Sequence, residues 1–500
     1  MNKNIFLINV VWIYFAFSCT GSSHIYDNYE GVYRGKPIIN ASAVIGNYPS
    51  TSFLYYVPVT GERPITCVVE GLPTGLIFDN ETGIISGVVE KVGEYKVKLT
   101  AENKLGTAVK EIKIVIGDKL VLTPPMGWNS WNTFGRSLTE SLIIETAEAM
   151  IRNGMRDVGY TYINIDDFWQ LGERGEDGHI QIDKEKFPNG IKYVADYLHE
   201  RGFKLGIYSD AADKTCGGVC GSLGFEETDA ADFAEWGIDL LKYDYCNAPD
   251  DRQTAIDRYT AMGKALRNTN RSIVFSICEW GGREPWLWAK DAGGHYWRTT
   301  YDIRDRWQVE NYSYRENGVL NILDINAPLA QYAEPGAWND PDMLVVGISG
   351  NSQTMNTGEE DIVGCTPEQY RSHMNLWAMM AAPLLSGNDV RNMDSVTLET
   401  LTNPEIIAIN QDILGKQGKR TIKTDTFQIW EKELADGKKA VAYLNTTGES
   451  IVLPHNDQTK AYLTISQKVR DVWKHEYLEK KSGKLKLDLQ SYECKVYVFE

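Results

Sequence analysis

Carboxylates and tryptophans recur together after short apolar runs in the middle of this chain. Aromatic rings can stack on the apolar face of a pyranose, and carboxylates accept hydrogen bonds from its hydroxyl groups. Glycoside hydrolysis also needs two carboxylates facing the scissile bond, one as nucleophile and one as acid and base. These residue types therefore indicate a sugar-hydrolysing site, although their spacing alone does not identify the pair. The groups are Asp166-Asp167-Phe168-Trp169, Tyr208-Ser209-Asp210, Lys242-Tyr243-Asp244, Cys278-Glu279-Trp280, Arg298 to Asp302, and Trp338 to Met343.

Alternating apolar runs and helical patterns surround these groups, from about residue 119 to 415. Stretches such as 137–153 and 251–267 are typical of helices, and the runs between are too apolar to have a face in water. Buried parallel strands joined by helices predict a (β/α)8 TIM barrel, with catalytic groups at the carboxyl ends of its strands. The expected strands are 126–128, 162–165, 204–208, 240–243, 273–277, 295–300, the neighbourhood of 338, and 382–385.

The regions on either side of the barrel alternate apolar and polar residues with period two, which is typical of strands. Short runs separated by turn clusters predict a β-sandwich over residues 24–118. A small antiparallel β-sandwich is predicted over residues 416–500. The run at 71–87 resembles the immunoglobulin-like (Ig-like) modules of bacterial surface proteins. That resemblance implies a spacer or a weak binding module, without chemistry of its own.

Residues 1–23 predict an export signal. Lys3 gives a positive start, and the mostly apolar stretch 5–17 is too short to span a bilayer as a helix. Cys19 follows a small residue and precedes a polar stretch, as in bacterial lipoprotein signals. We expect a periplasmic or cell-surface protein attached to the membrane through a lipidated Cys19, or else a plainly secreted one.

Composition narrows the range of partners. The formal net charge of -17 would repel nucleic acid, so no nucleic-acid partner is expected. The chain has seven histidines and no CxxC pair, and we predict neither a metal site nor a cofactor. With Cys19 set aside, seven cysteines remain, so at least one is unpaired if the others pair internally. The sequence does not indicate an oligomeric state.

Five short runs in the barrel region resemble one enzyme family. They are PPMGWNSW at 124–131, IDDFW at 165–169, LLKYD at 240–244, CEWG at 278–281 and WNDPDM at 338–343. In this order they resemble glycoside hydrolase family 27, the α-galactosidase family. The resemblance implies a retaining exo-α-galactosidase that removes terminal α-D-galactosyl residues from oligo- or polysaccharides by double displacement.

The resemblance also assigns the catalytic pair. The nucleophile is the last residue of the LLKYD run, Asp244, and the Lys242 ammonium on the same side of the strand is expected to keep it ionised. The family's acid/base follows an arginine by four residues, which gives Arg298 and Asp302. We expect burial and the negative neighbour to raise the pKa of Asp302 so that it holds a proton near neutral pH. Asp305 is assigned to the helix that comes next in the chain.

Other positions match residues around the family's sugar. Asp166 and Asp167 are expected to bind the 4- and 6-hydroxyl groups, which would favour the axial 4-hydroxyl of galactose. Cys278 and Trp280 would crowd the 2-position and disfavour an N-acetyl group there. The implied substrate-binding residues are Trp131 (stacking on the sugar), Asp166, Asp167, Tyr208, Lys242, Cys278, Trp280, Arg298 (near the 2-hydroxyl) and Asp342.

The resemblance leaves some roles open. Cys216 and Cys246 match a family disulfide between the loops after the third and fourth strands, with Asp210 beside it. Cys278 is expected to be free, because His295 and its neighbours replace the partner cysteine of the animal enzymes. Trp128 is either a sugar contact or a core residue.

Two other functions remain as alternatives. A β-L-arabinopyranosidase on the same scaffold would need a bulkier residue in the Asp166-Asp167 pocket, and none is evident. A non-catalytic carbohydrate-binding protein would lack a catalytic carboxylate, yet both Asp244 and Asp302 are present. The sequence does not indicate which group is attached to galactose in the natural substrate.

Overall fold

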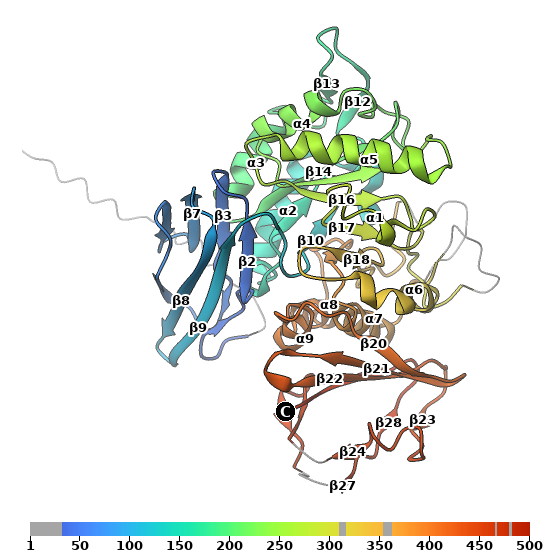
Figure 1. The fold of residues 1–500 in the computed structure, drawn as a ribbon. Helices are drawn as coiled ribbons and strands as arrows, with labels where there is room; N and C mark the ends of the chain where they lie inside the picture. The colour runs from blue at the N-terminus through green and yellow to red at the C-terminus, as the bar shows by residue number, and fades with distance from the viewer. Residues whose placement is uncertain (1–32, 310–316, 354–362, 466–467, 480–482) are drawn as a thin grey trace, which may run out of the picture.

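A computed structural model describes residues 33–309, 317–353, 363–465, 468–479 and 483–500. The predicted export signal and Cys19 lie outside these residues. Three parts follow one another along the chain: a β-sandwich, a barrel and a second β-sandwich (Figure 1). No helix among the described residues is long and apolar enough to cross a membrane.

The N-terminal part is a two-sheet sandwich with the predicted Ig-like character. One sheet has the order β2-β9-β8-β5, the other β3-β7-β6, and β1 pairs with β4. Alternate residues of β8 are buried, because Val97 and Leu99 face the core while Lys96 and Lys98 face water. The strands are β1 Ile38–Ile39, β2 Val44–Asn47, β3 Ser52–Tyr56, β4 Val59–Thr60, β5 Thr66–Glu70, β6 Leu76–Asp79, β7 Ile84–Val88, β8 Gly93–Asn103 and β9 Gly106–Ile116.

The middle part is the predicted parallel barrel, and each of the eight expected strands overlaps an observed one. The sheet order is β18-β17-β16-β15-β14-β11-β10-β19, with every pair parallel. Leu344, just after β18, closes the ring by bridging Ser386 of β19. The strands are β10 Met126–Asn129, β11 Tyr162–Asn164, β14 Lys204–Asp210, β15 Leu240–Asp244, β16 Val274–Cys278, β17 Tyr296–Arg298, β18 Trp338–Asp340 and β19 Leu384–Ser386.

Helices cover the outside of the barrel, and several begin at a side-chain cap. Thr139 caps α2 and Asp251 caps α5, each accepting a hydrogen bond from a backbone N–H of the first turn. Between β16 and β17 only a short 3-10 helix, η3 Pro285–Leu287, replaces the usual α-helix. The α-helices are α1 Trp131–Phe134, α2 Glu140–Arg152, α3 Ile191–His199, α4 Glu226–Glu235, α5 Arg252–Arg267, α6 Val319–Asn326, α7 Pro367–Met379, α8 Ser395–Thr402 and α9 Pro404–Asn410. The remaining barrel elements are η1 Gly135–Ser137, η2 Arg156–Val158, η4 Ala327–Tyr332 and the hairpin β12 Gln170–Arg174 with β13 Ile180–Ile182.

The C-terminal part is an antiparallel sandwich that packs on α7 (Figure 1). Asn375 of α7 ties the two parts together, since its Nδ2 donates to the Cys494 carbonyl and its Oδ1 accepts from Trp473 Nε1. The main sheet has the order β20-β21-β22-β29-β25-β26. The elements are β20 Lys419–Lys423, β21 Phe427–Glu433, η5 Ala435–Gly437, β22 Lys439–Asn445, β23 Ile451–Val452, β24 Thr464–Ile465, β25 Val469–Asp471, β26 Glu476–Tyr477, β27 Gly483–Lys484, β28 Asp488–Leu489 and β29 Cys494–Phe499.

The Ig-like module is docked on the barrel through buried polar contacts. Asp157, just before β11, accepts hydrogen bonds from Tyr56 (2.7 Å) and from Arg63, whose Nη2 lies 2.5 Å from Asp157 Oδ2. The Tyr48 hydroxyl lies 3.0 Å from His295 Nε2, just before β17. These barrel residues precede their strands, so the module covers the amino ends of the strands and lies opposite the carboxyl ends.

Candidate active site

The predicted polar groups meet where the parallel strands end. In the β14, β15 and β16 register, Asp210, Asp244 and Cys278 are paired at one level. Tyr208 and Lys242 are paired two residues below, on the same side of their strands. Strand alternation therefore presents these side chains at the same mouth of the barrel.

Asp244 is a buried carboxylate held from two sides. Its Oδ2 accepts a hydrogen bond from the Tyr208 hydroxyl at 2.9 Å, and its Oδ1 accepts one from the Tyr245 backbone N–H at 3.0 Å. Burial raises the pKa of Asp244 to about 7, while the positive charge of Lys242 opposes the rise. Lys242 therefore favours the ionised form as expected, but it offsets only part of the desolvation, and the pKa stays above the usual aspartate value.

Lys242 makes its direct ion pair with Asp166. The Nζ atom lies 2.8 Å from Asp166 Oδ2, which also accepts a hydrogen bond from Asn129 Nδ2 at 2.9 Å. Burial lowers the pKa of Lys242, but its negative neighbours, Asp166 foremost and then Cys278 and Asp244, together outweigh burial and leave the pKa above its usual value. The Asp166 carboxylate is therefore fixed at the barrel mouth by two donors, Lys242 and Asn129.

The loop after β14 fixes Asp167. Asp167 Oδ2 accepts a hydrogen bond from the Gly217 backbone N–H at 2.8 Å, and Oδ1 accepts one from the Phe168 N–H at 2.8 Å. A Cβ atom on Gly217 would overlap the Phe168 ring, so glycine is needed for this approach. Gly217 carries no motif that indicates this role, although it adjoins a cysteine predicted to form a disulfide.

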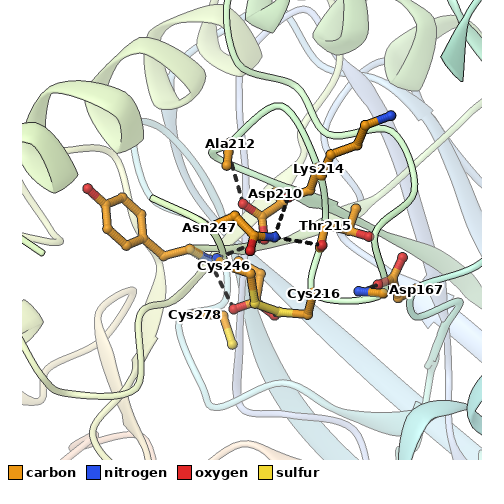
Figure 2. The surroundings of a disulfide bond; sticks show 12 residues. Asp167, Asp210, Ala212, Lys214, Thr215, Cys216, Cys246, Asn247 and Cys278 are labelled. Atoms are coloured by element: carbon orange, nitrogen blue, oxygen red, sulfur yellow. Dashed lines mark hydrogen bonds between the residues drawn. A yellow bond between two sulfur atoms is a disulfide. The ribbon is translucent and has the colours of Figure 1, made fainter. Parts of the chain in front are cut away.

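A disulfide joins Cys216 to Cys246 as predicted, and Figure 2 shows it beside Asp210. Asp210 Oδ2 accepts a hydrogen bond from the Cys246 backbone N–H at 2.9 Å. Cys216 Sγ lies 3.3 Å from Asp244 Oδ2, so the bond directly borders the predicted nucleophile. The ligand atoms of these four residues lie within 4.8 Å of one another, as in a metal site. Both sulfurs are bonded to each other, however, and a metal takes cysteine as thiolate.

Arg298 connects the remaining carboxylates. Its Nη2 lies 3.1 Å from Asp302 Oδ1 and 2.9 Å from Asp342 Oδ2, and its Nη1 lies 3.8 Å from Cys278 Sγ. Cys278 is buried and free, as expected. Asp342 also accepts a hydrogen bond from the Ile303 backbone N–H at 2.8 Å, which anchors the segment after Asp302.

The pKa of Asp302 differs from the expectation. Partial desolvation by the surrounding site raises this pKa, but Arg298 and Lys242 together outweigh it and hold the pKa below the usual value. The expectation of a raised pKa is therefore wrong for the unliganded site. The Asp302 side chain is 53% exposed, whereas Asp244 is only 5% exposed. Asp302 thus faces the solvent side of the pocket and Asp244 its base.

Two aromatic pairs border the pocket. Trp131 is partly exposed and stacks on Phe168, with ring centroids 6.1 Å apart and planes at 11°. Trp280 stacks on Tyr301 at 5.4 Å and 26°. Trp128, in contrast, is fully buried and its Nε1 donates to the Asn388 carbonyl at 2.7 Å, so it is a core residue.

Asp305 is not in a helix. It lies in a bend, where its carboxylate accepts hydrogen bonds from the Tyr370 hydroxyl and the backbone N–H groups of Gly350 and Cys365. It therefore ties the loop after β17 to the loop after β18. Helical periodicity could not show this, because the partners are distant in the sequence.

All nine predicted substrate-binding residues and both predicted catalytic carboxylates lie at this one mouth. Contacts missed by sequence reasoning come from Asn129 and Gly217, which position Asp166 and Asp167. Asn129 lies in the run at 124–131 that resembles the family, but the sequence alone indicated no role for its side chain. A further buried carboxylate, Glu279, has a pKa raised by burial to about 7 and binds Arg283.

Comparisons with known proteins agree from residue 36 to residue 499. The sequence model of the family described as "Alpha galactosidase A" matches residues 123–412. An Ig-domain model matches residues 36–117, and a model of the α-galactosidase C-terminal β-sandwich domain matches residues 424–499. Each match falls on one of the three parts of the fold.

Full-length relatives support the same grouping. An alpha-galactosidase of Cyamopsis tetragonoloba is 43% identical over 378 residues, covering 75% of this chain and 86% of the relative. Alpha-galactosidase A of Cellvibrio japonicus is 47% identical, covering 67% of this chain and 78% of the relative. A crystal structure from Bacteroides fragilis is 60% identical with a TM-score of 0.88, covering 94% of this chain and 98% of that one. Alpha-galactosidase I of Mortierella vinacea is 35% identical with a TM-score of 0.69, covering 77% and 98%. The chain therefore belongs to glycoside hydrolase family 27, the α-galactosidase family.

Proposed function

We propose that this protein is a retaining exo-α-galactosidase with Asp244 as nucleophile and Asp302 as acid and base. The observation that carries the proposal is that the two carboxylates lie at the same mouth of the barrel, near enough for the Asp302 charge to raise the pKa of Asp244. Asp244 is buried at the end of β15 and accepts a hydrogen bond from the Tyr208 hydroxyl, while Asp302 follows β17, is exposed and pairs with Arg298. Double displacement needs one carboxylate below the sugar and one beside the leaving oxygen.

The reaction has two steps. Asp244 attacks the anomeric carbon, the bond from that carbon to the leaving oxygen breaks, and the Asp302 proton moves to that oxygen. A β-galactosyl ester on Asp244 results. Asp302 then takes a proton from water, the water oxygen bonds to the anomeric carbon, the ester bond breaks, and galactose leaves in the α configuration.

The protonation states are set by the two carboxylates together. Burial raises the pKa of Asp244 and the negative charge of Asp302 adds to the rise, whereas Arg298 and Lys242 hold the pKa of Asp302 below its usual value, so between these two values the two carboxylates hold one proton. A bound sugar displaces water from the exposed Asp302, which favours its neutral form. The proton thus lies on Asp302 when the leaving oxygen arrives, and the Asp244 charge is stabilised by Lys242 and Tyr208.

Selectivity for galactose is assigned to the fixed carboxylates. Asp166 and Asp167 each keep acceptor capacity for the 4- and 6-hydroxyl groups, and their backbone and side-chain donors prevent them from turning away. Trp131, supported by Phe168, offers a face for the apolar side of the ring. Cys278 and Trp280 close the wall at the 2-position, where Arg298 can donate to the hydroxyl group.

We also propose that the protein is exported and that Cys19 carries a lipid anchor. The disulfide beside the active site supports export, because such bonds persist in oxidising compartments. Replacing Cys19 with Ala should move the enzyme from the membrane fraction to the soluble fraction of the producing cells. An unchanged distribution would rule out the anchor.

A substrate panel tests the activity. We expect the enzyme to hydrolyse an aryl α-galactoside much faster than the matching α-N-acetylgalactosaminide or β-L-arabinopyranoside. Asp244→Asn should abolish turnover, while Asp196→Asn on the exposed face of α3 should not affect it. Preferred hydrolysis of the arabinopyranoside would assign the chain to the alternative activity.

A further inference from the structure

The loop after β17 places a second aromatic residue directly beside the proposed acid/base. Tyr301 precedes Asp302, and its ring stacks on that of Trp280 with centroids 5.4 Å apart and planes at 26°. The two rings come from the ends of neighbouring strands, β16 and β17. Both are partly exposed, so aromatic surface reaches solvent at this edge of the pocket.

The backbone segments that carry the two aromatic residues are anchored to neighbouring parts of the barrel. The Tyr301 carbonyl accepts a hydrogen bond from Asn317 Nδ2 at 3.1 Å, and Ile303 is bridged to Asn317. Trp280 has a φ of 60°, a left-handed conformation that bulky residues seldom adopt. The following Gly281 packs so closely on the Thr299 carbonyl that a Cβ there would overlap it. The backbone that carries each ring is therefore fixed, and the two rings stack on each other.

The position of the pair relates it to the leaving group. The leaving oxygen must lie within hydrogen-bonding reach of Asp302, which is 53% exposed, and the galactose ring occupies the space towards the buried Asp244. The group attached to that oxygen must consequently extend along the solvent side, past the residue next to Asp302. A partly exposed ring at this place offers a stacking surface for the apolar face of a pyranose.

We infer that Tyr301, supported by Trp280, binds the sugar ring attached directly to galactose in the substrate. This inference rests on the proposed function and narrows its substrate class to galactosides whose leaving group is a pyranoside. The Tyr301 ring raises kcat/KM for an oligosaccharide relative to a galactoside with a small leaving group.

The experiment compares two substrates that both need a proton from Asp302. One is an α-1,6-galactosyl trisaccharide, and the other is methyl α-galactoside. In Tyr301→Ala, the ratio of kcat/KM for the trisaccharide to kcat/KM for the methyl galactoside should fall about tenfold, the upper range for one aromatic contact. Tyr301→Phe should keep the ratio, because stacking needs the ring and not the hydroxyl.

Controls separate the outcomes. If Tyr301 only positioned Asp302, both substrates would lose rate together and the ratio would stay constant, which overturns the inference. Equal falls in the ratio for Tyr301→Ala and Tyr301→Phe would also overturn it. Tyr193→Ala, at an exposed tyrosine of α3, should keep the wild-type ratio. The proposed function itself fails only if the unmodified enzyme does not hydrolyse α-galactosides.

Discussion

Removing the Asp157 carboxylate should destabilise the barrel without affecting catalysis. Asp157 is 2% exposed and forms ion pairs with Arg63, at 2.5 Å, and with the buried Arg156, at 3.6 Å. It also accepts a hydrogen bond from the Tyr56 hydroxyl. Asp157→Ala therefore leaves two guanidinium groups in the interface without their carboxylate. Breaking a buried ion pair from one side costs about 3–5 kcal/mol, so we expect the thermal midpoint to fall by several degrees.

Tryptophan fluorescence is a suitable assay, because residues 33–117 contain no tryptophan and the signal reports on the barrel and C-terminal domain. Glu70→Ala is the matched control, since it breaks the exposed Lys98–Glu70 ion pair of the Ig-like module, away from the interface with the barrel. Its midpoint should stay near that of the unmodified protein. The kcat/KM of Asp157→Ala at 25 °C should stay within about twofold of the unmodified value, because the module lies opposite the catalytic end. A midpoint shift no larger than that of Glu70→Ala would refute a structural role for the docking.

Three further predictions concern the site. The pH profile of kcat/KM should be bell-shaped. Above about pH 7, the raised pKa of Asp244, the two carboxylates hold no proton for the leaving oxygen, and below the usual Asp range a second proton neutralises the nucleophile. A rate that keeps rising to pH 9 would contradict this. Lys242→Met should lower kcat/KM about 10- to 100-fold by removing a charge-assisted hydrogen bond from a buried carboxylate, and an unchanged value would show that this ion pair is dispensable. Replacing Cys216 and Cys246 with Ser opens a loop with a sequence separation of 30, and the free energy of unfolding measured with urea should fall by roughly 3–4 kcal/mol. Dithiothreitol should lower the free energy of unfolding of the unmodified protein and leave that of this variant unchanged.

Local patterns were sufficient to locate the barrel. Most of the strands carry a short apolar run with polar residues at or just after its end, where the chain reaches the open mouth, so both strand and site position are encoded locally. Closure of the ring through Leu344 is different, since a single bridge leaves no periodic pattern. The position of Asp305 and the docking of the Ig-like module also depend on partners far apart in the sequence.

The pKa values of the catalytic pair show the same limit. Sequence spacing places Lys242 near Asp244 and Arg298 near Asp302. The balance between burial and charge depends on how much of each carboxylate is exposed to water. Here that balance raises the pKa of Asp244 and lowers the pKa of Asp302. Neither direction can be predicted from spacing, because exposure is a property of the folded pocket.

The measurement that tests the central claim most directly is azide rescue of Asp244→Ala. Removing the nucleophile leaves room below the anomeric carbon, while Asp302 and the sugar contacts remain. With an aryl α-galactoside, azide should restore release of the aryl group, and NMR should identify the product as β-galactosyl azide, because the azide enters from the side that Asp244 occupied. An α-configured azide, or an Asp244→Ala variant that hydrolyses the substrate at the unmodified rate without azide, would contradict Asp244 as the nucleophile.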